Sequence, residues 1–185
     1  SSAASDVYKR QVHLSRDAIV STALELLTRY GLADVTMRRV ATSLGVAPGA
    51  LYWHVANKQA LIAAMASEIL APVSGATPTE LSRSLHHELT RWRDGAEVAI
   101  AGAAFPESTT RADLEELFTE ALHKEVPEGT SDSVGVAART LIHYVLGATF
   151  LEQSQAQLGT TTPEAITDEA AVRATELVVA GLRAL

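Results

Sequence analysis

Apolar residues recur three or four positions apart along most of this chain, which is the spacing of one face of an α-helix. The first stripe predicts a helix over residues 16–30, with Ser15 as its N-cap and Gly31 just after its last turn. Strand-like alternation of useful length and internal repeats are not visible. The pattern therefore predicts an all-α protein of about nine helices.

Three shorter helices are predicted to follow in close succession. Thr36 is placed to cap the first of them, which ends at Gly45. After a tight turn, a short helix begins at Pro48, where a first-turn proline is tolerated, and runs through Trp53. Asn57 then caps a fourth helix, which continues to a break over residues 72–78 that is rich in Pro, Ser, Gly and Thr.

The rest of the chain predicts five longer elements. The first follows a Thr77–Glu80 capping box with Pro at N1 and ends at an Asp94-Gly95 interruption. The others are a small-residue helix over 96–104, a helix from Thr109 or Thr110 through Leu122, a long apolar helix over 134–157, and an amphipathic helix from Ala165 or Asp168 to Leu185.

The first eleven residues, SSAASDVYKRQ, match codon by codon the translation of a common transposase-type sequencing adapter. We expect residues 1–11 to be an artefact of that origin, disordered and dispensable. A natural disordered arm is the alternative.

Charge and composition narrow the possible functions. The net charge of −7 is uneven, with five basic and three acidic side chains in residues 12–60 but eight basic and eighteen acidic side chains in residues 61–185. A mildly basic head on an acidic body suits a protein that touches nucleic acid at one end. The absence of Cys excludes disulfides and Cys-based zinc sites. Because neither a membrane-length apolar run nor a signal peptide is recognised, we expect a cytoplasmic protein without membrane association.

The segment from Thr36 to His54 has what a helix pair needs to enter a DNA major groove. Small Ala41 permits a close helix crossing, Gly45 allows a left-handed turn, and Leu51 buries the inner face of the second helix. This segment, with the sequence LYWHV and Asn57-Lys58, closely resembles the DNA-binding domain of the TetR family of bacterial transcriptional regulators over residues 15–70.

The resemblance implies the domain organisation, the function and the partners. Residues 12–59 would form a helix-turn-helix DNA-binding domain, and residues 60–185 a helical ligand-binding and dimerisation domain. The expected function is that of a ligand-responsive transcriptional regulator, most commonly a repressor. The implied partners are double-stranded operator DNA, a small-molecule effector and a second copy of the chain.

The resemblance also implies which residues contact DNA. Arg38 can reach a guanine edge or a phosphate. The remaining contacts are the phosphate-binding side chains and the tip of the reading helix, namely Thr36, Tyr52, Trp53, His54, Lys58, Ala47, Pro48, Gly49 and Ala50. The tip is almost bare of hydrogen-bonding groups, so it would read bases through methyl contacts, backbone atoms and DNA shape.

Two of these assignments have alternatives, and Arg39 is a further candidate. For Trp53, packing against the first or the fourth helix is favoured over a DNA contact, and His54 could be an ordinary surface histidine. Arg39 has two open interpretations, a contact to a DNA phosphate or a solvated position on the surface.

Two segments of the C-terminal half, Arg91–Val98 and His143–Gln153, resemble the tetracycline-repressor subgroup of the same family. In that subgroup's drug repressors, a histidine after the Arg-Asp-Gly sequence binds a drug-held magnesium ion, and this position is Ala99 here. The subgroup's other drug-binding positions fall at Leu81, Leu85, Leu117 and Ser74. An apolar side chain cannot ligate a hard cation, so we expect neither magnesium–tetracycline as effector nor a metal or other cofactor.

These replacements predict a largely apolar cavity suited to a flat or aliphatic effector. Its predicted lining is Leu81, Leu85, Ala99, Phe105, Leu114, Leu117, Phe118 and Ile142, with His143 and Glu152 as polar anchors. The alternative is that these residues fill a core. The neighbouring His86-His87 pair points about 100° apart on a helix and is interpreted as surface or pocket-edge residues, not a metal site.

Two further readings compete with a ligand-responsive regulator. An enzyme is not expected, because the sequence has no nucleophile–base constellation, phosphate-cradling Gly loop or HExxH pattern. A ligand-blind DNA-binding protein whose C-terminal domain only dimerises remains open, and the presence of a cavity separates it from the first hypothesis. Dimerisation itself is expected because the last two helices have wide apolar faces and one short helix reads too few base pairs.

Overall fold

The computed structural model describes residues 14–159 and 168–185, so the expected adapter segment 1–11 lies outside the described residues. Within those ranges the chain forms helices and no strand, which confirms the all-α prediction. The elements in chain order are α1 (Arg16–Tyr30), the 3-10 turn η1 (Leu32–Asp34), α2 (Met37–Leu44), α3 (Pro48–Leu51), α4 (Lys58–Leu70), α5 (Pro78–Thr90), α6 (Gly95–Ala103), α7 (Thr110–Glu125), α8 (Ser131–Gln157) and α9 (Asp168–Arg183).

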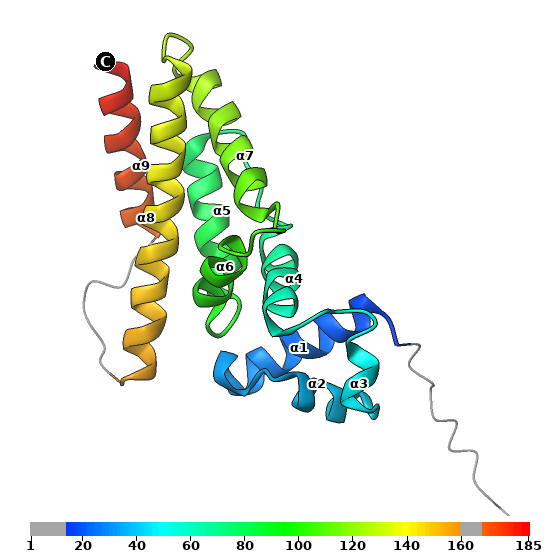
Figure 1. Cartoon of the computed structure of the whole chain (residues 1–185). Helices are drawn as coiled ribbons and strands as arrows, with labels where there is room; N and C mark the ends of the chain where they lie inside the picture. The colour runs from blue at the N-terminus through cyan, green and yellow to red at the C-terminus, as the bar shows by residue number, and fades with distance from the viewer. Residues whose placement is uncertain (1–13, 160–167) are drawn as a thin grey trace, which may run out of the picture.

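Helices α1, α2 and α3 form a head at one end of the molecule, and α4 leads from it into the body (Figure 1). In the body, α6 packs against α4, while α8 packs against α5, α6, α7 and α9. The predicted domain boundary at residues 59 and 60 falls inside α4, which contacts α1 on one side and α6 on the other. Buried residues of head and body consequently form one continuous hydrophobic core.

Side-chain caps explain where several helices begin. Ser15, Thr36, Asn57 and Thr77 each accept a hydrogen bond from the backbone N–H three residues further on, as their positions predict. The Thr77–Glu80 box differs in one respect from the expected pattern. The Glu80 carboxylate accepts from the N–H of Ala76, at 2.7 Å, one residue before the cap.

Several predicted helix ends were wrong: α5 ends at Thr90 and not at Asp94, α9 ends at Arg183 and not at Leu185, and the start of α8 and the end of α3 also differ. Helix α8 begins at Ser131, three residues before the predicted start, because the Thr130 hydroxyl accepts from the N–H of Ser133 at 3.2 Å. Helix α3 ends at Leu51 and does not reach Trp53. The N–H of His54 and that of Val55 both donate to the carbonyl of Leu51, which tightens the chain into a turn after the helix.

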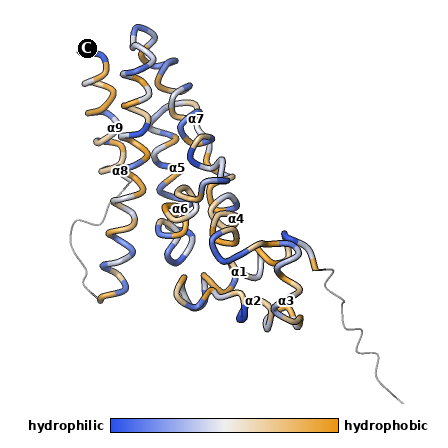
Figure 2. Tube along the Cα trace, in the orientation of Figure 1, coloured by the Kyte–Doolittle hydropathy of each residue, from blue (hydrophilic) through white to orange (hydrophobic). Residues whose placement is uncertain are grey.

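Helix α8 is the longest element, and by length and mean hydropathy alone it could cross a membrane, contrary to the expectation that no run of that length exists. Figure 2 shows that its hydrophobic positions give way to hydrophilic ones at its C-terminal end. Val134, Leu141, Val145 and Thr149 lie buried on its inner face. This pattern is that of the central helix of a bundle, with neighbouring helices on three sides.

Helices α4 and α6 approach each other closely at Gly102. A Cβ atom added there would lie 2.3 Å from the Cβ of Ala66, so the two helices could not keep their present separation. The connection between head and body therefore depends on the absence of a side chain at this position.

We predict that Gly102→Ala lowers the free energy of unfolding by about 1–3 kcal/mol through overpacking. Gly135→Ala, within α8, is the matched control, because its Cβ would meet only the Arg139 guanidinium at 3.5 Å. That variant should gain about 0.5–1 kcal/mol, since alanine favours a helix over glycine. Denaturant titration of both variants measures the difference, and equal stabilities would contradict the close-approach argument.

Candidate functional site

The turn between α2 and α3 has the geometry that the sequence predicts. Gly45 has φ +69°, in the left-handed region, and its N–H donates to the carbonyl of Thr42 at 3.1 Å. The N–H of Val46 donates to the carbonyl of Ala41 at 3.0 Å and closes the turn. Ala41 and Leu51 are fully buried, so the two short helices are held by their inner faces and leave their outer faces to solvent.

The residues predicted to contact DNA lie on that outer surface. Arg38 is exposed on α2, and the tip residues Ala47, Pro48 and Gly49 are exposed at the start of α3. Ala50 and Lys58 are half-buried. The Thr36 hydroxyl accepts from the N–H of Arg39 at 3.1 Å as an N-cap, which fixes its position at the end of α2.

Trp53 is 89% exposed, so the expectation that it packs against the first or the fourth helix is wrong. Because α3 ends at Leu51, Trp53 lies in the turn beyond the helix and projects away from the core. Tyr52, next to it, is 53% exposed, and His54 is also exposed. Tyr52 and Trp53 therefore form an exposed aromatic pair directly after α3.

Arg39 is held by its own domain. Its guanidinium forms a hydrogen-bonded ion pair with Asp34 in η1 and lies 4.0 Å from the ring centre of Tyr30. These contacts join α2 to the end of α1 and to η1. Arg39 therefore stabilises the packing of α2 against α1 and η1 within the head.

Besides α4 and the shared hydrophobic core, a buried carboxylate joins the body to the head. Asp94, in the turn between α5 and α6, is 94% buried and has φ +57°, a left-handed conformation that asparagine and aspartate tolerate better than most side chains. Its Oδ2 accepts from the N–H of Leu32 in η1 at 2.7 Å. Its Oδ1 accepts from the side-chain amide of Gln157 at the end of α8.

A second glutamine of α8 holds the same turn. The Gln153 Nε2 donates to the carbonyls of Leu89 and Trp92, at 3.2 and 3.0 Å, and its Oε1 accepts from the N–H of Ala96 at 3.0 Å. Gln153 and Gln157 are four residues apart and so lie on one face of α8. We call this arrangement the junction: Asp94 with Leu32 of the head, and Gln153 and Gln157 of α8.

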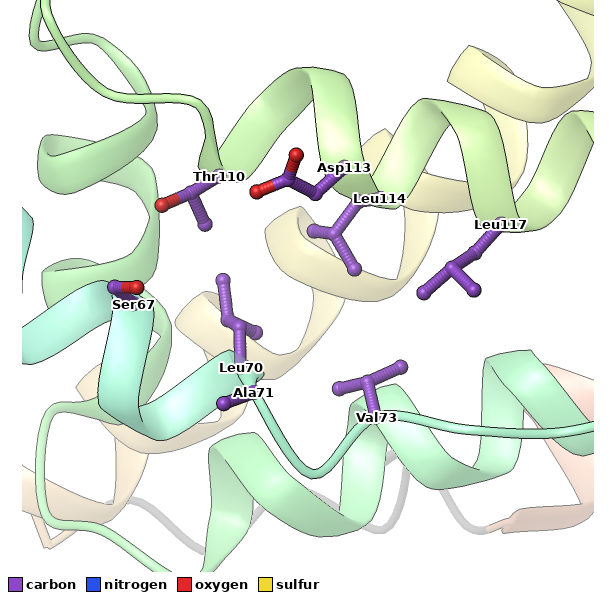
Figure 3. Close-up of a pocket in the computed structure, with 8 residues that line it drawn as sticks. All are labelled: Ser67, Leu70, Ala71, Val73, Thr110, Asp113, Leu114 and Leu117. Atoms are coloured by element: carbon purple, nitrogen blue, oxygen red, sulfur yellow. The ribbon is translucent and has the colours of Figure 1, made fainter.

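An open groove runs between α6, α7 and α8, with a volume of about 340 Å³. Its lining is mainly apolar and consists of Ile100, Ala103, Ala104, Arg111, Leu114, Ile142, His143, Leu146 and Gly147. A smaller cavity of about 180 Å³ lies on the other side of α7, against the end of α4, and Leu114 lines both spaces. Figure 3 shows Leu114 and Leu117 of α7 facing Leu70 and Val73 across this smaller cavity.

The predicted effector-binding residues divide into two groups. Leu114, Ile142 and His143 line the groove, and Leu117 lines the smaller cavity. Leu81, Leu85, Ala99 and Phe118 are fully buried in the hydrophobic core, which agrees with the core-filling alternative for these four.

Three other predicted positions are placed elsewhere. Phe105 is half-buried between α6 and α7 and lines neither space. The Glu152 carboxylate lies 3.5 Å from His86. His86 was expected at the surface or at a pocket edge, and with 8% exposure it is not at the surface. His87 is exposed, as expected.

Sequence reasoning missed the role of Asp94 in the junction. It also missed six residues of the groove, namely Ile100, Ala103, Ala104, Arg111, Leu146 and Gly147. Arg111 lies three residues before Leu114 on α7, so helical spacing alone could have placed it beside the groove. The contact between Asp94 and Leu32 joins residues 62 positions apart, and no local pattern signals it.

Comparison with known proteins agrees with this geometry. Residues 19–65 match the family model described as bacterial regulatory proteins, tetR family. The tetracycline repressor protein class D of Escherichia coli is 35% identical over 170 residues, which cover 84% of this chain and 74% of the relative. Crystal structures of Mycobacterium smegmatis BioQ, and of BioQ with its double-stranded DNA operator, are each 36% identical to this chain.

BioQ without DNA superimposes on this chain with a TM-score of 0.80, and the match covers 92% of this chain and 98% of BioQ. BioQ in the DNA complex superimposes with a TM-score of 0.79, and that match covers 93% of this chain and 99% of BioQ. The resemblance therefore extends over both the head and the body. The exposed outer face of α2 and α3, the glycine turn that orients them and these relatives lead to one conclusion: the chain belongs to the TetR family of bacterial regulatory proteins and is a DNA-binding transcriptional regulator, not an enzyme.

Proposed function

We propose that this protein is a cytoplasmic, homodimeric repressor that leaves its operator when a small, largely apolar effector binds the groove between α6, α7 and α8. The observation that carries the proposal is which helices form the walls of the groove. Helix α6 begins directly after Asp94, and α8 carries Gln153 and Gln157 two turns beyond Gly147. The helices that an effector would touch are thus the ones that hold the junction with the head.

The proposed DNA contacts follow from exposure and chemistry. Arg38 presents five N–H donors from the exposed side of α2, and it is placed to read a guanine edge. Tyr52, Trp53, His54 and Lys58 cluster around the end of α3 and the start of α4, where their donors and rings suit phosphate and sugar contacts.

The coupling needs no large rearrangement. An effector that pushes α6 away from α8 would change the distance between Asp94 and the two glutamines, and Asp94 is bonded to Leu32 in the head. A rotation of the two heads then moves them out of successive major grooves, whose spacing is about 34–36 Å. The effector must favour the released state by its own difference in affinity.

A second copy of the chain is proposed to cover the outer face of α8 and α9. Val136, Tyr144, Leu151 and Leu177 are between 39% and 70% exposed along these two helices. Within α8 the first three lie at helical spacing on one side. An added Cβ atom at Gly181 of α9 would meet nothing within 4 Å, which leaves room for close approach of a partner helix.

The structure argues for an effector other than magnesium–tetracycline, although several relatives are tetracycline repressors. Ala99, Leu81 and Leu85 are fully buried among apolar side chains. None of the three offers an oxygen or nitrogen donor, which a hard cation and its chelating drug need. A drug oxygen buried unpaired against them would cost a few kcal/mol, roughly.

Selection of bound DNA from a random pool tests DNA recognition directly. We expect an inverted repeat bound by one dimer, with affinity that falls steeply as salt rises. Arg38→Ala should cost about 1–3 kcal/mol of binding free energy and relax the preference at one base pair per half-site. Lys58→Ala should weaken all sequences alike and reduce the salt dependence.

The stability of both variants should match that of the unmodified protein, because neither side chain is buried. Binding of a single, non-repeated site by a monomer would contradict the proposal. So would an Arg38→Ala variant whose base preferences are unchanged.

The proposed dimer face is tested by Leu151→Lys and Leu177→Lys, which place a charge in the centre of the apolar surface. We expect each variant to sediment as a monomer at concentrations where the unmodified protein is a dimer. Ala33→Lys, an exposed apolar position in the head, introduces the same charge and should remain dimeric. Unchanged dimers for both leucine variants would rule out this face.

Magnesium with tetracycline should not release the protein from its selected operator. Fluorescence anisotropy of a labelled duplex, titrated with tetracycline with and without magnesium, measures this. Tight magnesium-dependent release would show that the apolar residues at positions 81, 85 and 99 do not govern the choice of effector.

A further inference from the structure

We infer that the effector carries a carboxylate on an apolar body, and that Arg111 with His143 binds the carboxylate at the mouth of the groove. This inference rests on the proposed function and specifies the chemistry of the ligand that the groove would take. It differs from the expectation of polar anchors at His143 and Glu152, because Glu152 lies beside His86 and outside the groove lining.

The groove has a sharp division between apolar and polar groups. Of its nine lining residues, Arg111 on α7 and His143 on α8 are the two with polar side chains, and the others are apolar or glycine. His143 is exposed, and the Arg111 side chain is 68% exposed, so both donors are available at the solvent side. Leu114, Ile142 and Leu146 are buried and form the inner end.

The lining of the groove carries one permanent charge, the Arg111 guanidinium, and it contains no carboxylate. A local positive charge therefore faces the groove although residues 61–185 as a whole hold eighteen acidic and eight basic side chains. The neighbour of Arg111 is Glu115, one turn further along α7, with a distance of 3.8 Å between Arg111 Nε and Glu115 Oε1. An exposed pair of this length is weak, and the guanidinium has five N–H donors, so it can also bind a carboxylate through two of them.

The geometry of the groove sets the form of the ligand. A carboxylate at Arg111 and His143 leaves an attached alkyl or aryl group to extend toward Ile142 and Leu146, and then to Leu114. Burial of that group against apolar side chains supplies most of the binding free energy, and the carboxylate supplies orientation and selectivity. A volume of about 340 Å³ lies at the lower end of small-molecule sites and suits a compact monocarboxylate.

Decanoate and decanamide form the first test pair, with 2-naphthoate and 2-naphthamide as the flat pair. Each amide keeps the apolar group of its acid and removes the negative charge. We expect at least one acid to bind the DNA-free dimer at least tenfold more tightly than its amide in calorimetric titration, which corresponds to about 1.4 kcal/mol. The same acid should release a labelled operator duplex at correspondingly lower concentration.

Arg111→Gln should remove the preference for the acid while leaving binding of the amide unchanged. Arg111→Lys, which keeps the charge but loses the planar pair of donors, should retain part of it. Lys124→Gln is the matched control, because Lys124 is also an exposed cation on α7 with a glutamate partner one turn away, Glu120 at 3.9 Å. That variant should keep the full preference.

Equal affinity for acid and amide in both pairs would overturn the inference, as would an undiminished preference in Arg111→Gln. Failure of all four compounds to bind would overturn it too. These outcomes are separate from failure of the proposed function. Selective binding of an acid that leaves the operator complex intact would support the carboxylate site and contradict effector-driven release, and absence of any selected operator would contradict DNA recognition alone.

Discussion

In addition to α4 and the shared hydrophobic core, one buried carboxylate connects the head of this molecule to its body. Asp94 accepts from the backbone of Leu32 in the head with one oxygen and from Gln157 of α8 with the other. A buried charge that lost either donor would be costly, so the carboxylate is stable only while head, turn and α8 keep their relative positions. The left-handed backbone at Asp94 and the adjacent Gly95, whose added Cβ would lie 2.2 Å from the carbonyl of Leu89, leave this turn little freedom.

In the proposed function, this constraint connects a ligand in the groove of the body to the DNA-reading surface of the head. The walls of the groove are α6, which starts at the junction, and α8, which supplies both glutamines. The body has a large apolar core and resists gradual deformation, so a ligand between these helices is expected to shift them as units. The charge distribution separates the two parts further. The mildly basic head attracts DNA, whereas the acidic body repels it.

The sequence predicted most of the fold because its signals are local. Ser15, Thr36 and Asn57 are caps, and Gly45 has the left-handed conformation that the turn requires. The outer face of α2 and α3 followed from the same local pattern, as did the apolar stripes of the body. Helix ends were less predictable, because the start of α8 depends on which of several polar residues forms the cap.

The lining of the proposed effector groove could be predicted only in part. Leu81, Leu85 and Phe118 have the same hydrophobic character as Leu114 and Ile142, and which of them faces a groove or a core depends on how helices pack. The η1 turn and the contact between Asp94 and Leu32 depend on residues distant in sequence. The surroundings of Trp53 could not be predicted for a similar reason. They depend on where α3 ends, and because α3 ends at Leu51 the Trp53 side chain is exposed.

We expect the junction to fix the orientation of each head relative to its body. The chain has no cysteine, so Ser43→Cys on the exposed side of α2 gives one spin label in each protomer. Pulsed electron spin resonance then measures the distance between the two labels in the DNA-free dimer. Asp94→Gly keeps a residue that adopts positive φ but removes both carboxylate contacts, whereas Asp94→Asn keeps an acceptor for Leu32 and a group that can pair with the Gln157 amide. We predict a narrow distance distribution for the unmodified junction and for Asp94→Asn, and a broad one for Asp94→Gly; equally narrow distributions in all three would contradict the account.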